Sequence, residues 1–173
     1  MTNPFTRNRL IGLVLAGAIY ALDQWIKGYV TWTLKLPEKG KIDLLPFFDL
    51  TWVENYGVSL GMLTAQSMEM RWGLVALTGL IALVVFIWIM REKLMADILG
   101  LSLVLGGAAG NIDDRMMHGF VVDYADFHIG DFRPFLVFNL ADAAITIGVL
   151  IILARSFLSR EKPEAKAQAG EAA

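Results

Sequence analysis

The segment from Trp72 to Met90 carries no charged side chain and is long enough to cross a membrane. A helix needs about 20 mainly apolar residues to span the hydrocarbon core of a bilayer. Three further segments, at about 10–34, 94–112 and 135–154, have a similar length and are interrupted by only a few charged residues. The sequence therefore predicts an all-α integral membrane protein with four transmembrane helices.

The composition supports a membrane protein and excludes several other classes. Hydrophobic residues make up 56% of the chain and charged residues 18%, whereas soluble domains have about 45–50% and about 25%. Intrinsic disorder is excluded by this apolar content. The 15 basic residues do not outnumber the 17 acidic ones, so no nucleic-acid partner is expected. The chain has no cysteine, which rules out disulfides and thiolate chemistry.

The first segment has a second interpretation as a cleaved signal peptide. Arg7 and Arg9 precede an apolar run, and Ala18-Ile19-Tyr20-Ala21 resembles a cleavage site with small residues at its ends. Against this, apolar residues resume after Lys27, and three further segments follow. We therefore favour an uncleaved first helix.

The short connection between the second and third segments indicates the orientation. It consists of Arg91-Glu92-Lys93, and short basic loops stay on the cytoplasmic side. Both termini are then cytoplasmic, and the two long connections lie on the outer side of the membrane. The number of basic residues is nearly equal on the two sides of the membrane, so the short basic loop is the main indication of the orientation.

The two long connections are expected to be structured. Residues 35–68 contain the alternating run Leu50-Thr51-Trp52-Val53, which predicts a small β-structure, followed by a segment lying along the membrane. Residues 113–134 contain a predicted strand at Phe120-Val121-Val122 within a loop or short helix. We expect one four-helix domain over residues 1–160, and a disordered cytoplasmic tail at 161–173 because that stretch is rich in Ala, Glu and Lys.

Asp142 is the most informative polar residue, because it falls inside the fourth predicted span. A charged residue there costs about 2.5–3.5 kcal/mol on insertion scales, and such residues usually face the protein interior. It is seven residues from the predicted start of the span at Phe135, roughly 10 Å below it. Asn139 lies on the same helical face. A functional role is favoured over a purely structural buried carboxylate.

Asp123 follows the predicted strand at 120–122, and by itself it would be an ordinary loop residue. Its significance depends on whether the chain brings it close to Asp142. Two carboxylates in a low-dielectric site share a proton, so one can activate water while the other donates to the carbonyl oxygen or the leaving amine. The chain has no cysteine, GxSxG or HExxH motif. This set of residues is consistent with amide hydrolysis in which water, and not a protein side chain, is the nucleophile.

Several other polar residues have spacings that admit a structural or a functional role. Asp23 and Lys27 are four apart and can pair along one helix. Asn111 and Arg115 are also four apart, just after the small residues at 106–110 that let a neighbouring helix approach closely.

Asn55 and Gly57 have the composition of a turn. His118 and His128 lack the spacing of metal ligands, so no metal or other cofactor is expected.

Five blocks of the chain form a recognisable set: Asp23-Gln24-Trp25-Ile26-Lys27, Asn55-Tyr56-Gly57-Val58-Ser59, the run from Gly106 through Asn111 to Asp114-Arg115, Val121-Val122-Asp123, and Phe138-Asn139-Leu140-Ala141-Asp142. In this order and at this spacing they resemble the bacterial lipoprotein signal peptidase family, also called signal peptidase II. The resemblance covers residues 10–155.

The resemblance implies an aspartyl endopeptidase of the bacterial inner membrane. It would remove signal peptides from diacylglyceryl-modified prolipoproteins, cleaving just before the lipidated cysteine, and would be inhibited by the cyclic peptide globomycin. The family's catalytic pair falls on Asp123 and Asp142. Its other recurrent polar positions fall on a set that shapes the site or contacts substrate: Asp23, Lys27, Asn55, Gly57, Asn111, Arg115 and Asn139.

Two alternatives remain from other functional classes. A small proton- or ion-coupled carrier would use Asp142 and the Asp23/Lys27 pair as intramembrane charges. A non-catalytic lipoprotein-binding scaffold would use the same surface without cleavage. The carrier would explain the buried charges but not Asp123, which lies outside the predicted span.

Overall fold

Four long helices form the body of the protein. The computed structural model describes residues 4–57 and 68–171. The helices are α1 (Pro4–Gly28), α3 (Met68–Arg91), α4 (Met95–Met117) and α5 (Leu140–Glu171). A π-helical turn, η1 (Tyr29–Thr33), extends α1. Within the described residues, four helices are long and apolar enough to cross a membrane: Thr6–Thr33, Met68–Arg91, Met95–Met117 and Leu140–Leu158. The predicted all-α membrane architecture is confirmed.

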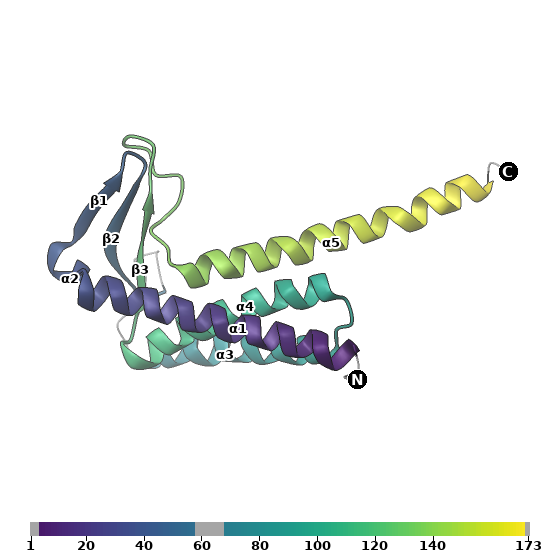
Figure 1. Ribbon diagram of the computed structural model, residues 1–173, viewed down its shortest axis with the longest axis horizontal. Coiled ribbons are helices and arrows are strands. Elements are labelled where there is room, and N and C mark those ends of the chain that lie inside the picture. The colour runs from purple at the N-terminus through teal and green to yellow at the C-terminus, as the bar shows by residue number, and fades with distance from the viewer. Residues whose placement is uncertain (1–3, 58–67, 172–173) are drawn as a thin grey trace.

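Helix α4 is the centre of the bundle, with α1, α3 and α5 packed against it (Figure 1). Glycines on α4 make the close approach possible. A Cβ added at Gly106 would lie 2.5 Å from the backbone oxygen of Ala16 on α1, and at Gly107 its nearest atom would be the backbone oxygen of Ala141 on α5. The prediction of close helix packing at 106–110 is therefore confirmed, and it places the first turn of α5 directly against α4.

A three-stranded antiparallel sheet stands at one end of the bundle, and both chain termini lie toward the other end (Figure 1). After the short helix α2 (Leu36–Lys39), β1 (Lys41–Leu45) and β2 (Phe48–Asn55) form a hairpin, and β3 (Val121–Phe127) pairs with β2. The register places Val53 opposite Asp123 and Asn55 opposite Val121. The strands predicted around 50–53 and 120–122 are thus both present.

The fourth span begins later than the sequence predicts. Helix α5 begins at Leu140, not at Phe135, because the backbone of Phe138 pairs with β3 instead. The N–H of Phe138 donates to the Ala125 oxygen (3.1 Å), and the Phe138 oxygen accepts from the N–H of Ala125 (2.8 Å). Asp142 consequently lies in the first turn of α5 rather than two turns below its start.

Three further expectations have different outcomes. Helix α4 continues to Met117 and no helix lies between it and α5, so of the loop or short helix expected within 113–134 the loop is present. Helix α5 continues to Glu171 where a disordered tail was expected from residue 161, in keeping with the high helix propensity of Ala, Glu and Lys. The expected membrane-hugging segment falls mainly on 58–67, outside the described residues.

Candidate active site

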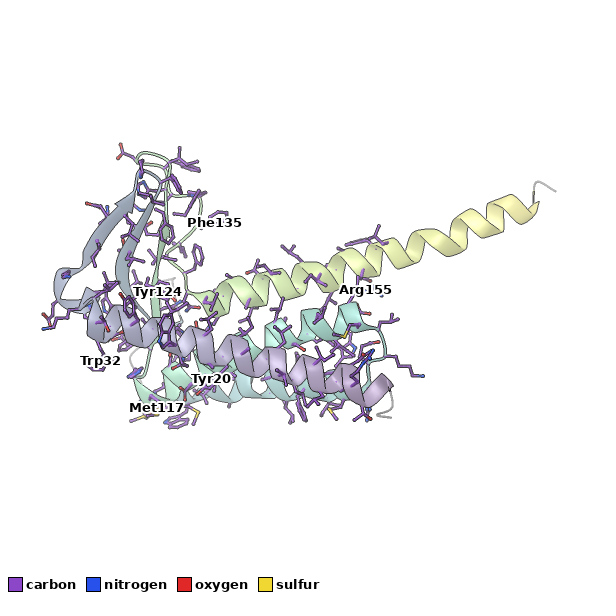
Figure 2. The ribbon with its side chains drawn as sticks, in the orientation of Figure 1. Tyr20, Trp32, Met117, Tyr124, Phe135 and Arg155 are labelled. Carbon is purple, nitrogen blue, oxygen red and sulfur yellow. The ribbon has the colours of Figure 1, made fainter. Side chains whose placement is uncertain are left out.

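Asp123 and Asp142 come from different elements, β3 and α5, and meet at the junction between the sheet and the bundle. The backbone pairing of Phe138 with Ala125 brings the start of α5 alongside β3. Tyr124, the residue after Asp123, marks this junction in Figure 2, where its hydroxyl accepts the N–H of Leu140 (3.2 Å). The two aspartates are therefore neighbours because of one strand-to-helix connection.

Asn139 lies between the two carboxylates and contacts both. Its side-chain Nδ2 donates to Asp123 Oδ1 (2.7 Å), and its backbone N–H donates to Asp142 Oδ2 (3.3 Å). Its Oδ1 accepts the N–H of Asp142 (2.9 Å). This reciprocal exchange is a capping box at the N-terminus of α5. The same residue thus begins the helix and connects the two acids.

Asn111 on α4 fixes the other oxygen of Asp142. Its Nδ2 donates to Asp142 Oδ1 (2.8 Å), while its Oδ1 accepts from Lys27 Nζ and from Asn139 Nδ2, both at 3.2 Å. Because two donors face Oδ1, the amide of Asn111 has one favourable orientation. That orientation presents its N–H to Asp142.

Asn55, at the end of β2, holds Asp123 from the opposite side. Its Nδ2 donates to Asp123 Oδ2 (3.0 Å), and its Oδ1 accepts the N–H of Gly57 (2.8 Å). Gly57 has a φ of 88°, a backbone conformation that favours glycine. The turn expected at Asn55 and Gly57 is therefore present, and it orients a side chain of the site.

Asp123 is buried and sits in an environment that disfavours its charged form. Burial raises its pKa from 3.8 to about 6; the hydrogen bond from Asn55 opposes this rise, and the charge of Asp142 adds to it. Only 2% of the residue is exposed. A carboxyl group that changes protonation near neutral pH is suited to proton transfer at that pH.

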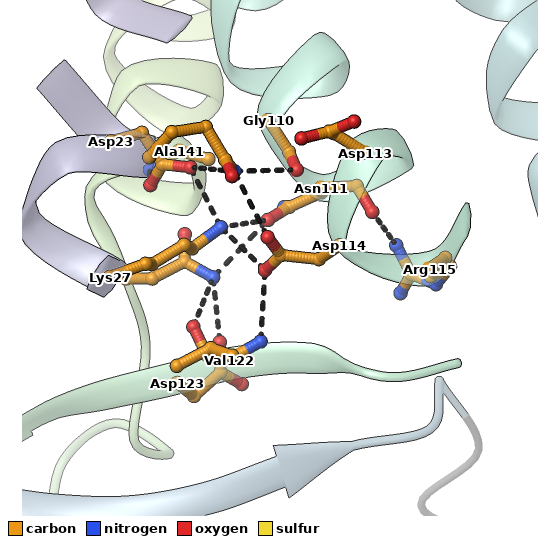
Figure 3. Close-up of polar contacts among 12 residues, drawn as sticks. Asp23, Lys27, Gly110, Asn111, Asp113, Asp114, Arg115, Val122, Asp123 and Ala141 are labelled. Carbon is orange, nitrogen blue, oxygen red and sulfur yellow. Dashed lines mark hydrogen bonds and ion pairs between the residues drawn. The ribbon is translucent and has the colours of Figure 1, made fainter. Parts of the chain in front are cut away.

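Asp23, Lys27 and Asp114 form a buried ion triad next to the site (Figure 3). Lys27 Nζ contacts Asp23 Oδ2 at 2.7 Å and Asp114 Oδ2 at 2.8 Å, and all three residues are at most 3% exposed. The pairing of Asp23 with Lys27 was predicted from their spacing, but the part of Asp114 was not. Asp114 lies three residues after Asn111, on the same face of α4, and that spacing could have indicated it.

Arg115 is half-buried beside the site with an unused donor. Its Nη1 donates to the Asn111 carbonyl oxygen (3.3 Å), and its Nε has no hydrogen-bond partner among the described residues. A Cβ added at Gly57 would lie 3.5 Å from Arg115 Nη2. The guanidinium therefore lies against the turn that orients Asn55.

An apolar pocket of about 340 Å³ opens beside Asp142. Its walls are formed by the residues before α5 and by one face of that helix: Phe135, Leu136, Phe138, Ala143, Thr146 and Ile147. Within the described residues, no group of three or more His, Cys, Asp and Glu side chains is arranged to hold a metal ion. The site thus combines two acids, amide donors and an apolar surface.

Comparison with known proteins identifies the family. The sequence model of signal peptidase (SPase) II matches residues 15–158. The chain belongs to the signal peptidase II family. The lipoprotein signal peptidase of Sphingopyxis alaskensis is 51% identical over 160 residues, covering 92% of this chain and 91% of that protein. That of Rhizorhabdus wittichii is 52% identical over 161 residues, covering 93% and 94%.

Two solved structures share the fold of this signal peptidase II family member. One, described as a bacterial membrane enzyme structure by the in meso method at 2.3 Å resolution, has a TM-score of 0.74 and 26% identity, covering 88% of this chain and 90% of that one. A second, at 1.9 Å resolution, has a TM-score of 0.72 and 28% identity, covering 84% and 91%. Together with its four apolar helices, this makes the chain a multi-pass bacterial membrane protein.

Proposed function

We propose that this signal peptidase II family member is a membrane aspartyl endopeptidase that removes signal peptides from diacylglyceryl-modified prolipoproteins. Cleavage falls immediately before the lipidated cysteine, and Asp123 and Asp142 are the catalytic residues. The observation that carries the proposal is the shared contact with Asn139, which bonds to both carboxylates. The relatives named lipoprotein signal peptidase support the substrate class.

The chemistry follows from two carboxyl groups that share one proton. The ionised group takes a proton from water as the water oxygen attacks the scissile carbonyl carbon, and the protonated group donates to the carbonyl oxygen. The tetrahedral species then collapses, the C–N bond breaks, and the leaving nitrogen takes a proton. Either aspartate can fill either part. The pKa of about 6 at Asp123 supports a proton shared near neutral pH.

The surroundings of the two acids suit a membrane-embedded peptide. The apolar pocket beside Asp142 accommodates apolar portions of the substrate. Of the region 35–68, the described residues 35–57, which include α2, β1 and β2, act as a cradle that holds the substrate from outside the bilayer. Globomycin competes by occupying the same site.

The site lies at the sheet end of the bundle, away from the termini (Figure 1). We place that end at the periplasmic side of the inner membrane and both termini in the cytoplasm. The basic connection Arg91-Glu92-Lys93, between α3 and α4, supports this orientation.

Replacement of each aspartate tests the proposal. Asp123→Asn and Asp142→Asn are purified in detergent, and cleavage of a diacylglyceryl-modified prolipoprotein peptide is measured together with its binding. We expect cleavage to fall by about 10²–10⁴-fold, with binding retained. Asp97→Asn is the control, because Asp97 accepts from Arg155 Nε (2.6 Å) at the opposite end of the bundle (Figure 2). Cleavage by Asp123→Asn at the wild-type rate would contradict the protease proposal and favour a carrier or scaffold.

A further inference from the structure

The two acids of the buried ion triad hold the residues that directly precede the two proposed catalytic aspartates. Asp23 Oδ1 accepts the backbone N–H of Ala141 (3.0 Å), one residue before Asp142. Asp114 Oδ2 accepts the backbone N–H of Val122 (3.0 Å), one residue before Asp123. Lys27 lies between the two acids. The triad therefore connects the backbones of β3 and α5 through α1 and α4 (Figure 3).

Each of these contacts gives a backbone N–H group a side-chain acceptor on another element. The N–H of Ala141 lies in the first turn of α5, where helix geometry provides no intrahelical acceptor. The Val122 N–H lies in β3 and donates to a side chain on α4. Gln24 contacts the other oxygen of Asp114, because its Nε2 donates to Asp114 Oδ1 (3.0 Å). Asp114 thus has defined partners on both of its oxygens.

Stability alone does not account for this arrangement. Taking charges out of water is costly, and replacing a buried ion pair by apolar groups of the same shape is often neutral or stabilising. The triad contains two acids and one base, so its formal charges do not cancel. What the two acids supply that apolar residues cannot is a directional acceptor for each of the two backbone N–H groups, while Lys27 donates to both acids.

We propose that Asp114 is a positioning residue which, together with Asp23 and through Lys27, sets the separation of Asp123 and Asp142. This inference rests on the proposed function, since it assigns a purpose to the spacing of the two acids. A displacement of about 1 Å in a catalytic group can lower a rate by about 100-fold. The coupling of two carboxyl groups that share a proton also depends on their separation.

Two substitutions at one position separate geometry from charge. Asp114→Asn and Asp114→Leu both remove the negative charge, but only asparagine keeps an oxygen that accepts the Val122 N–H. We expect Asp114→Leu to lower kcat by about 100-fold and Asp114→Asn by less than about 10-fold. Asp97→Asn, which loosens the α4–α5 contact far from the site, serves as the control that retains wild-type cleavage.

The pH profile distinguishes positioning from a general loss of folded enzyme. If Asp114→Leu lets Asp123 and Asp142 move apart, their electrostatic coupling weakens and the two apparent pKa values of the pair come closer together. The acidic and basic limbs of the pH–rate profile should therefore lie closer together in Asp114→Leu than in Asp114→Asn. A loss of folded protein scales a profile without moving its limbs. The ionisable groups facing the pair are unchanged between these two variants: Asp23 and Lys27 from α1, Arg115 from α4 and Tyr124 from β3.

Equal rates and equal limb positions for Asp114→Asn and Asp114→Leu would overturn the inference. If Asp114→Leu does not fold, Gln24→Leu provides the test, because it removes a donor to Asp114 and leaves every charge in place. The pH–rate profile of Gln24→Leu should then be narrower than that of the wild type, by less than is expected for Asp114→Leu. A Gln24→Leu profile with the same limb positions as the wild type would overturn the inference. The proposed function fails separately, by continued cleavage in Asp123→Asn.

Discussion

Asn139 and Asp142 exchange two hydrogen bonds across the first turn of α5. The N–H of Asp142 donates to Asn139 Oδ1 (2.9 Å), and the N–H of Asn139 donates to Asp142 Oδ2 (3.3 Å). The motif that begins the helix therefore also orients a proposed catalytic carboxylate. Because Asn139 additionally donates to Asp123, its contribution to stability and its contribution to catalysis can be measured apart.

Substitution of Asn139 by serine and by alanine makes that separation. Serine is a good N-cap residue and alanine is not, so Asn139→Ala should be less stable than Asn139→Ser by about 1 kcal/mol. Both variants lack the amide that donates to Asp123, so both should lose at least about 100-fold in cleavage. Thermal unfolding in detergent and peptide cleavage measure the two effects. Cleavage that followed the order of stability instead would contradict the catalytic part of Asn139.

The raised pKa of Asp123 predicts how stability changes with pH. The carboxyl group has a pKa of about 6 in the folded protein and 3.8 as its ordinary value. Between these values the folded state binds more protons than the unfolded state, so this group makes stability fall as pH rises from about 4 to about 6. Asp123→Asn removes the ionisation, and its stability should exceed that of the wild type at pH 7, with little difference at pH 4. Unfolding midpoints at the two pH values provide the measurement, and a constant difference between the proteins would refute it.

The sequence predicts the elements of this site better than their assembly. The spans follow from apolar length, and the Asp23–Lys27 pair follows from helical spacing, so both are local properties. The start of α5 is not local, because the backbone of Phe138 pairs with Ala125 on a distant strand. The role of Asp114 is hidden for the same reason, since its partners, Lys27 and the Val122 N–H, come from other elements.

The proposed orientation predicts which introduced cysteines react from outside the cell. The native chain has no cysteine, so single substitutions give an unambiguous signal. Leu45→Cys lies at the end of β1, where the native side chain is exposed, and should react with a membrane-impermeant thiol reagent in intact cells. Ala165→Cys lies in the C-terminal part of α5 and should react only after the membrane is permeabilised. The reverse labelling pattern would place the candidate site in the cytoplasm.

Gly57 links the turn after β2 to the position of Asp123, and its replacement should affect catalysis more than stability. Its φ is 88°, and an added Cβ would lie 2.6 Å from Leu74 Cδ1, so in Gly57→Ala either the Leu74 side chain or the turn whose N–H bonds to Asn55 must move. Asn55 in turn donates to Asp123. Gly40→Ala is the matched control, because Gly40 also has a positive φ, 72°, but open space around an added Cβ. We expect both variants to lose about 1–2 kcal/mol of stability from backbone strain, while only Gly57→Ala lowers kcat/KM, by about 10-fold or more. Equal cleavage by the two variants would show that the turn does not position Asp123.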